Sequence, residues 1–216
     1  MSKTQIKICG IKTPEALDAA IAAGASHVGL NFFAKSPRYV SPEIAGSLSA
    51  RAAGRVQIVG LFVDAEPGFI EEVRKQARLD IIQLHGDERP ASVNMIRQRG
   101  GLETWKVIPI RTSADFADTQ KYRGSVDFVL YDAKPPEGAD LPGGNGLRFD
   151  WKLLQGTSHP LPWGLAGGLD ARNVGEAIRI TSAGLVDVSS GVETGPGIKD
   201  VDKIAAFCQA VLDLSD

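Results

Sequence analysis

Short apolar runs alternate with amphipathic segments along the whole chain. Eight runs that are rich in β-branched residues predict strands. They cover residues 5–9, 27–32, 56–63, 80–85, 104–110, 127–133, 161–166 and 184–190. Most of them begin roughly 22 to 30 residues after the previous one, the period of a strand, a helix and two turns.

The segments between these runs have the pattern of amphipathic helices. Several begin with Ser, Asp or Pro and end near Gly, as helices commonly do. The predicted helices cover residues 14–24, 41–54, 66–78, 87–100, 113–124, 149–156, 170–184 and 197–214. No change in composition divides the chain, so we expect a single domain over residues 1–216.

Eight strand–helix units predict an α/β fold, and the positions of the glycines decide between two versions of it. A doubly wound open sheet carries a glycine-rich phosphate loop after its first strand. Here the first turn is CGIKTPE, and the glycines gather near the end of the chain. The sequence therefore predicts a single (βα)₈ TIM barrel, and its modest length requires mostly tight loops.

Two glycine-containing turns follow the last two predicted strands. Gly167 and Gly168 follow the seventh, and Ser189, Ser190 and Gly191 follow the eighth. Backbone N–H groups at such turns, with a helix start behind them, bind anions. Either cluster alone could simply mark a turn. Together they match the place where β/α barrels bind a phosphate group.

Composition and charge exclude several classes of protein. The formal net charge of −2 argues against nucleic-acid binding, and the few, scattered aromatic residues argue against base stacking. No apolar run is long enough to span a bilayer, and the first residues do not read as a secretory signal. The two cysteines and three histidines have no metal-site spacing. We expect a cytoplasmic protein without a metal.

Two predicted strand ends carry reactive side chains. Cys9 ends the first strand, although a cysteine with apolar neighbours is often only a small buried hydrophobic residue. To act as a base near neutral pH, its thiol needs a pKa below the usual value of about 8.5. Asp132 ends the sixth strand, where it could cap a turn or donate a proton in a partly dry mouth. On opposite sides of a barrel, the two could act on one substrate.

Further candidates lie at strand ends and in two long loops, 33–43 and 133–151, which we expect to cover the mouth. Arg38, in the rigid turn KSPRY, is expected to be exposed and to hold a carboxylate by two hydrogen bonds. Asp187 is expected to order the serine turn, and His85 only to line the site. Cys208 fits the buried face of the last helix.

The chain resembles the phosphoribosylanthranilate isomerase family over nearly its whole length. The segments that carry the resemblance occur in the family's order. They are KICGI, KSPRYVSP, VGLFV, QLHGDE, the block from YDAK to FDW, GGLDARNV and DVSSGVETGPGIKD. The departures are Lys12 where threonine is common, Asn145 in place of Ser or Thr, and Ala166 where serine is frequent.

The resemblance implies a barrel of the ribulose-phosphate-binding type that needs no cofactor. It also implies an Amadori rearrangement in tryptophan biosynthesis, with Cys9 as general base and Asp132 as general acid. Arg38 would bind the anthranilate carboxylate. The turns at Gly167-Gly168 and Ser190-Gly191 would bind the phosphate. We expect a small phosphosugar–anthranilate substrate, no nucleic-acid or membrane partner, and a monomer or homodimer.

Two rival functions remain at this point. A sugar-phosphate isomerase of histidine synthesis resembles this chain but has an aspartate in the position of Cys9. A non-catalytic phosphate-binding barrel is the other possibility, but it has no need of a thiol and a carboxylate at facing strand ends.

Overall fold

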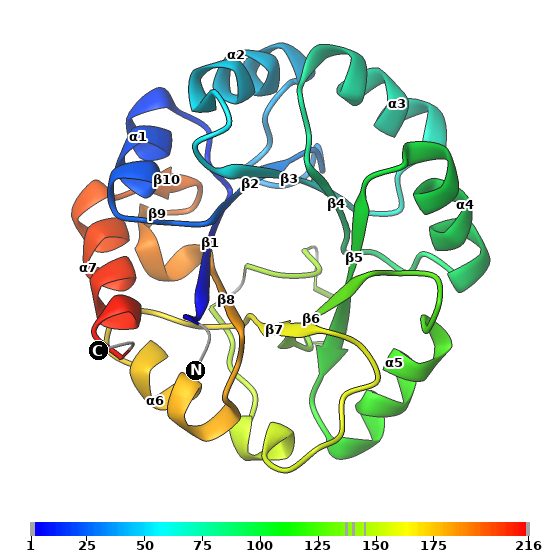
Figure 1. The fold of residues 1–216 in the computed structure, drawn as a ribbon, viewed down its shortest axis with the longest axis vertical. Coiled ribbons are helices and arrows are strands. Elements are labelled where there is room, and N and C mark those ends of the chain that lie inside the picture. The colour runs from blue at the N-terminus through cyan, green and yellow to red at the C-terminus, as the bar shows by residue number, and fades with distance from the viewer. Residues whose placement is uncertain (1–2, 137, 140, 145, 215–216) are drawn as a thin grey trace.

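Eight parallel strands close into a barrel in the order of the chain (Figure 1). The computed structural model describes residues 3–136, 138–139, 141–144 and 146–214. The barrel strands are β1 (Gln5–Cys9), β2 (His27–Asn31), β3 (Gln57–Phe62), β4 (Ile81–Leu84), β5 (Glu103–Ile110), β6 (Phe128–Ala133), β7 (Trp163–Leu165) and β8 (Leu185–Val188). Each matches one of the eight predicted runs, so the predicted barrel is confirmed.

Helices surround the barrel on the outside (Figure 1). They are α1 (Pro14–Ala22), α2 (Pro42–Ala52), α3 (Pro67–Gln76), α4 (Pro90–Gly100), α5 (Ala117–Lys121), α6 (Val174–Thr181) and α7 (Val201–Leu212). The first four begin with proline, whose fixed φ suits the first helical position. Thr13 and Ser41 cap α1 and α2 through their hydroxyl groups. None of the helices in the described residues is long and apolar enough to cross a membrane.

Several predicted helices are shorter than their sequence pattern indicates. The predicted helix 113–124 consists of a 3₁₀ turn, Ser113–Phe116, and the short α5. The predicted helix 149–156 is only a 3₁₀ turn, Trp151–Leu154, because Asp150 caps a single turn that buries Trp151 and Leu154. Helix α6 begins at Val174 rather than near residue 170. Asp170 instead closes a turn by accepting hydrogen bonds from the backbone N–H groups of Arg172 and Asn173.

Residues two apart along a strand share a face, and this alternation separates the two cores of the protein. The apolar interior of the barrel contains Val59, Ile81, Trp105, Val107, Leu130 and Leu185. The alternate residues of the strands, such as Ile6 and Ile8, join the larger core that packs with the helices. Farther along the same inward faces, polar side chains replace apolar ones and form the mouth of the barrel.

A two-stranded antiparallel hairpin lies between β8 and α7, where the sequence predicts no strand and instead begins the helix 197–214. It consists of β9 (Glu193–Gly195) and β10 (Ile198–Lys199). Gly197 turns the hairpin with φ +76°, and a Cβ atom there would collide with the carbonyl oxygen of Pro37. The hairpin therefore packs directly against the loop that carries Arg38.

Candidate active site

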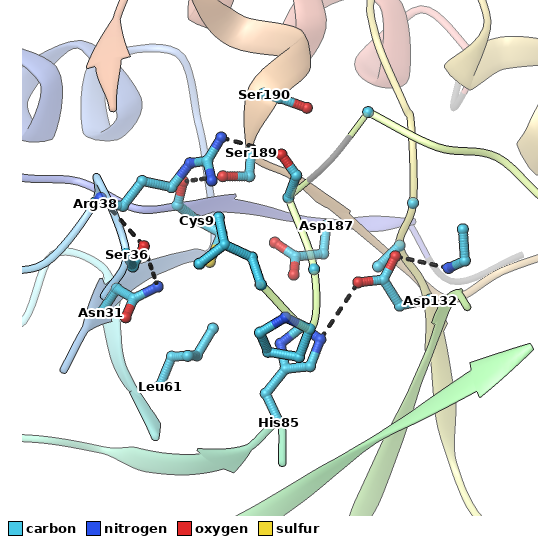
Figure 2. Close-up of a pocket in the computed structure, with 18 of the residues that line it drawn as sticks. Cys9, Asn31, Ser36, Arg38, Leu61, His85, Asp132, Asp187, Ser189 and Ser190 are labelled. Carbon is cyan, nitrogen blue, oxygen red and sulfur yellow. Dashed lines mark hydrogen bonds and ion pairs between the residues drawn. The ribbon is translucent and has the colours of Figure 1, made fainter. Parts of the chain in front are cut away.

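One pocket opens at the carboxyl ends of the strands. Cys9, Arg38, Asp132, Gly167, Gly168 and Ser190, which the sequence singles out, all line it. Figure 2 shows Cys9 and Arg38 on one side of this pocket and His85 and Asp132 on the other. In a closed parallel barrel, the carboxyl ends of all strands lie at the same rim. This closure brings β1 and β6 to one pocket, although they are far apart in the chain. The exception among the predicted residues is Gly191, which does not line the pocket.

Cys9 is the last residue of β1, and its sulfur lies in a crowded, charged environment. Only 6% of the residue is exposed. Burial raises the pKa of the Cys9 thiol above its ordinary value, while the positive charge of Lys7 acts in the opposite direction. Burial outweighs the charge of Lys7, so the pKa of Cys9 is raised and not lowered.

Asp132 is the residue before the last of β6, and two neighbours contact its carboxylate. Its Oδ1 atom accepts a hydrogen bond of 2.7 Å from the backbone N–H of Ala133, and its Oδ2 atom lies 3.5 Å from Nε2 of His85. Figure 2 shows this contact at one edge of the pocket. Gly167 leaves room for the carboxylate, because a Cβ atom there would lie 2.8 Å from Oδ1. His85 therefore does more than line the pocket: it contacts the candidate acid.

The two predicted phosphate turns lie side by side. Both Gly167 and Gly168 have positive φ angles, +92° and +60°, which favour glycine. A Cβ atom on Gly191 would collide with the carbonyl oxygen of Leu169. Gly191 therefore brings the two turns into contact instead of lining the pocket. Ser190 begins a single 3₁₀ turn at the rim, and the hydroxyl of Ser189 donates to the carbonyl oxygen of Cys9 at 3.2 Å.

Arg38 is not exposed, contrary to the expectation from sequence. It is only 5% exposed, because Glu193 holds its guanidinium inside the protein. Its Nε and Nη2 atoms each donate to one carboxylate oxygen of Glu193 at 2.8 Å. Lys199 donates to the same carboxylate at 2.7 Å. Burial raises the pKa of Glu193, but these two cations hold it below the ordinary value overall.

Asp187 has a different partner from the one expected. The Oδ2 atom of Asp187 contacts Nζ of Lys7 at 2.8 Å, and not a residue of the serine turn. Its Oδ1 atom is buried and has no hydrogen-bond partner in the described part of the chain. The serine turn is instead ordered by Lys199, which donates to the carbonyl oxygen of Ser189 at 3.0 Å.

The long loop after β6 crosses the barrel opening (Figure 1). Gly143 packs so closely on His85 and Asp132 that a Cβ atom would lie 2.6 Å from the His85 ring and 2.9 Å from Asp132 Oδ2. The carbonyl oxygen of Gly144 accepts a hydrogen bond of 3.2 Å from Arg38. Asn145, one of the departures from the family pattern, lies outside the described residues.

The other two departures from the family pattern are described. Ala166 lines the pocket, and Lys12 donates to the carbonyl oxygen of Pro37 beside the mouth. Neither residue contacts Cys9 or Asp132 through a hydrogen bond or ion pair within the described residues.

Three charged residues of the site are absent from the sequence-based prediction: Lys7, Glu193 and Lys199. Lys7 could have been found, because it stands two residues before Cys9 on the same strand and so shares its face. Glu193 and Lys199 lie in a segment that gives no strand signal. Their roles depend on a hairpin and on a pairing that spans 155 residues of sequence.

Comparisons with known proteins agree with this geometry. The model of the N-(5'phosphoribosyl)anthranilate (PRA) isomerase family matches residues 6–210. The N-(5'-phosphoribosyl)anthranilate isomerase of Zymomonas mobilis subsp. pomaceae is 54% identical over 206 residues, which cover 95% of this chain and 96% of the relative. The corresponding protein of Rhizobium meliloti is 48% identical over 209 residues, 97% of each chain.

Solved structures give the same result. A phosphoribosyl anthranilate isomerase from Thermotoga maritima superposes with a TM-score of 0.87 and 35% identity, covering 96% of this chain and 98% of that one. A phosphoribosyl anthranilate isomerase in complex with reduced 1-(o-carboxyphenylamino)-1-deoxyribulose 5-phosphate gives 0.84 and 33%, with the same coverage. With a barrel of the same kind and relatives of this similarity over nearly its full length, the chain belongs to the N-(5'-phosphoribosyl)anthranilate isomerase family.

Proposed function

We propose that Cys9 is the general base and Asp132 the general acid of the reaction that this family catalyses. Family membership makes the chain an isomerase of L-tryptophan biosynthesis. Its reaction converts N-(5'-phosphoribosyl)anthranilate to 1-(2-carboxyphenylamino)-1-deoxyribulose 5-phosphate. One observation supports the two roles most strongly: a thiol from β1 and a carboxyl group from β6 line the same pocket.

The reaction proceeds in two proton-transfer stages. Asp132 protonates the ring oxygen of the ribose, and the ring opens to a Schiff base. The Cys9 thiolate then takes the proton from the second carbon of the sugar, and the electron pair moves to the iminium nitrogen. The resulting enolamine tautomerises to the ketone. Each well-placed transfer contributes about 10²–10⁴ in rate.

The two anionic ends of the substrate are bound on different sides of the pocket. The adjoining turns at Gly167-Gly168 and Ser190-Gly191 hold the phosphate with backbone N–H groups. Arg38 binds the anthranilate carboxylate. Because Glu193 occupies the Nε and Nη2 atoms, the Nη1 end of the guanidinium makes this contact. These two contacts orient the sugar between the acid and the base.

The reaction needs neither a metal nor a cofactor, because the iminium nitrogen accepts the electron pair. The substrate is a small phosphosugar–anthranilate conjugate, and no nucleic-acid or membrane partner takes part. The protein works in the cytoplasm as a monomer or homodimer, with residues 1–216 forming a single domain. One related protein from Thermotoga maritima is described as dimeric.

Complementation of a tryptophan auxotroph that lacks this isomerase tests the proposal. The wild type and a Cys208→Ser control restore growth without tryptophan, because Cys208 lies buried in α7, away from the pocket. Cys9→Ser and Asp132→Asn do not restore growth at matched expression. Equal rescue by Cys9→Ser would remove the cysteine from the mechanism, and failure of the wild type would contradict the function itself.

A further inference from the structure

A buried cluster of charges lies beside Cys9 inside the barrel. Lys7 precedes Cys9 by two residues on β1, so both side chains point into the interior. The ammonium group of Lys7 is fully buried and contacts Asp187 of β8 at 2.8 Å. The positive charge of Lys7 also opposes the rise in the pKa of the Cys9 thiol. The ammonium group therefore lies where it can act on both a carboxylate and the thiol.

The neighbouring strand leaves space for this contact. Gly29 of β2 pairs with Cys9 in the strand register. A Cβ atom on Gly29 would lie 2.9 Å from the Cys9 sulfur and 3.3 Å from Nζ of Lys7. The sulfur and the ammonium group thus occupy the same small volume, which any larger residue on β2 would fill.

We propose that Lys7 is a positioning residue of the isomerisation: its ammonium group, fixed by Asp187, is the cation against which the Cys9 sulfur forms a thiolate. This inference rests on the proposed role of Cys9 as the base. When the thiolate takes the proton from the sugar, the sulfur becomes a neutral thiol. Lys7 keeps its own proton throughout and transfers nothing.

The charges around the sulfur make this partner necessary. Burial alone raises the pKa of Cys9, and the carboxylate of Asp187 raises it further. Lys7 and, more weakly, Lys199 of β10 oppose both effects. The other ionisable groups that line the pocket in the described residues are Arg38, on the same side as Cys9, and Asp132 and His85 on the far side. Of the groups that oppose the rise in the pKa of Cys9, Lys7 is the one on the same face of the same strand.

A buried ion pair can also be purely structural, and replacement of both partners by apolar residues can leave stability unchanged. If Lys7 serves only to neutralise Asp187, its removal changes the stability of the barrel but not the acidity of Cys9. The deciding quantity is therefore the pH dependence of the reactivity of Cys9, measured in folded protein.

The experiment measures alkylation of Cys9 by iodoacetamide between pH 6 and 10, with the labelled peptide quantified by mass spectrometry. In Lys7→Met the profile moves to higher pH by about one unit or more, so that labelling near neutral pH slows about tenfold. Lys7→Arg, which keeps the cation, stays closer to the wild type. Lys106→Met is the control, because it removes another buried lysine from an ion pair, the pair of Lys106 with Glu88. In this control the profile is unchanged.

If Lys7→Met does not fold, the double variant Lys7→Met/Asp187→Leu replaces the pair by apolar residues and is compared with Asp187→Leu, which keeps the cation but lacks the opposing carboxylate. A profile of folded Lys7→Met that coincides with the wild type, or of the double variant that coincides with Asp187→Leu, overturns the inference. So does an equal shift in Lys106→Met. Circular dichroism establishes that each variant is folded before it is labelled.

Turnover separates this inference from the proposed function. In Lys7→Met, kcat falls at least tenfold, KM changes little, and the rising limb of the pH–rate profile moves with the labelling profile. Full activity of Cys9→Ser would contradict the proposed base, whereas the labelling of Cys9 in Lys7→Met would still decide whether Lys7 controls the thiol. Lost turnover of Lys7→Met with an unchanged labelling profile of Cys9 contradicts the role of Lys7 and does not contradict the proposed function.

Discussion

Arg38 and Glu193 form a two-point ion pair inside the protein, with both N–O distances at 2.8 Å. The pair joins the loop after β2 to the hairpin after β8 and leaves the Nη1 end of the guanidinium unoccupied by Glu193. The carboxylate of Glu193 is also held by Lys199. Glu193 therefore fixes the direction in which Arg38 points, which is the orientation that the proposed carboxylate contact requires.

Loss of this orientation should weaken substrate binding more than catalysis. In Glu193→Gln, we expect KM to rise about tenfold or more with little change in kcat, because charge-assisted hydrogen bonds contribute about 1.5–3 kcal/mol. Arg38→Met should raise KM further, since it removes the carboxylate contact itself. Steady-state kinetics, followed by the loss of substrate fluorescence, measure KM and kcat of both variants. Unchanged KM in Arg38→Met would remove Arg38 from the site.

Gly167 is expected to control the position of Asp132. In Gly167→Ala, the added methyl group meets Asp132 Oδ1 and the backbone of Ala133, so kcat should fall by at least tenfold. Gly124→Ala is the matched control, because Gly124 also has a positive φ, +83°, but has no atoms within 4 Å of the added carbon. Both variants should lose about 1 kcal/mol of stability from backbone strain.

Only Gly167→Ala should lose turnover at a temperature where both variants are folded. An equal loss of kcat in the two variants would mean that backbone strain, and not the position of the Asp132 carboxylate, explains the effect.

His27 should make the barrel sensitive to acid. Burial, and then the charge of Lys7, lowers the pKa of His27 from 6.5 to about 4, so the folded protein favours the neutral ring. The unfolded chain takes up a proton near pH 6.5 and the folded one does not. The stability from the neutral ring is therefore complete above about pH 6.5 and is lost as the pH falls toward 4.

Urea unfolding at pH 7.5 and pH 5 measures this contribution. Between these two values the wild type should lose about 2 kcal/mol more than His27→Gln, whose side chain does not titrate. The same loss in both proteins would assign the acid sensitivity to other groups.

The strands and the presence of Cys9 and Asp132 in one pocket were predictable because they depend on local pattern. Alternating apolar residues fix the face on which each side chain lies, and the closed barrel then brings Cys9 and Asp132 to the same rim. The glycine turns were predictable for a similar reason, although the contact of Gly191 with Leu169 shows that one of these glycines serves packing between turns.

The ion pairs were not predictable, because each depends on a contact between distant segments. The sequence around Arg38 is typical of a polar surface loop. Arg38 is buried in the structure because Glu193, from a distant segment, binds its guanidinium. The segment 149–156 looks helical because Trp151 and Leu154 have suitable spacing for one turn. The pattern did not reveal that a 3₁₀ turn suffices to bury these two side chains.

The proposed mechanism requires a thiol base and a carboxyl acid that act from opposite sides of one pocket. The most direct test is the kcat of purified Cys9→Ser and Asp132→Asn on N-(5'-phosphoribosyl)anthranilate, followed by fluorescence. We expect each substitution to lower kcat by about 10²–10⁴ while KM stays close to the wild-type value. A kcat near that of the wild type in either variant would contradict the assignment.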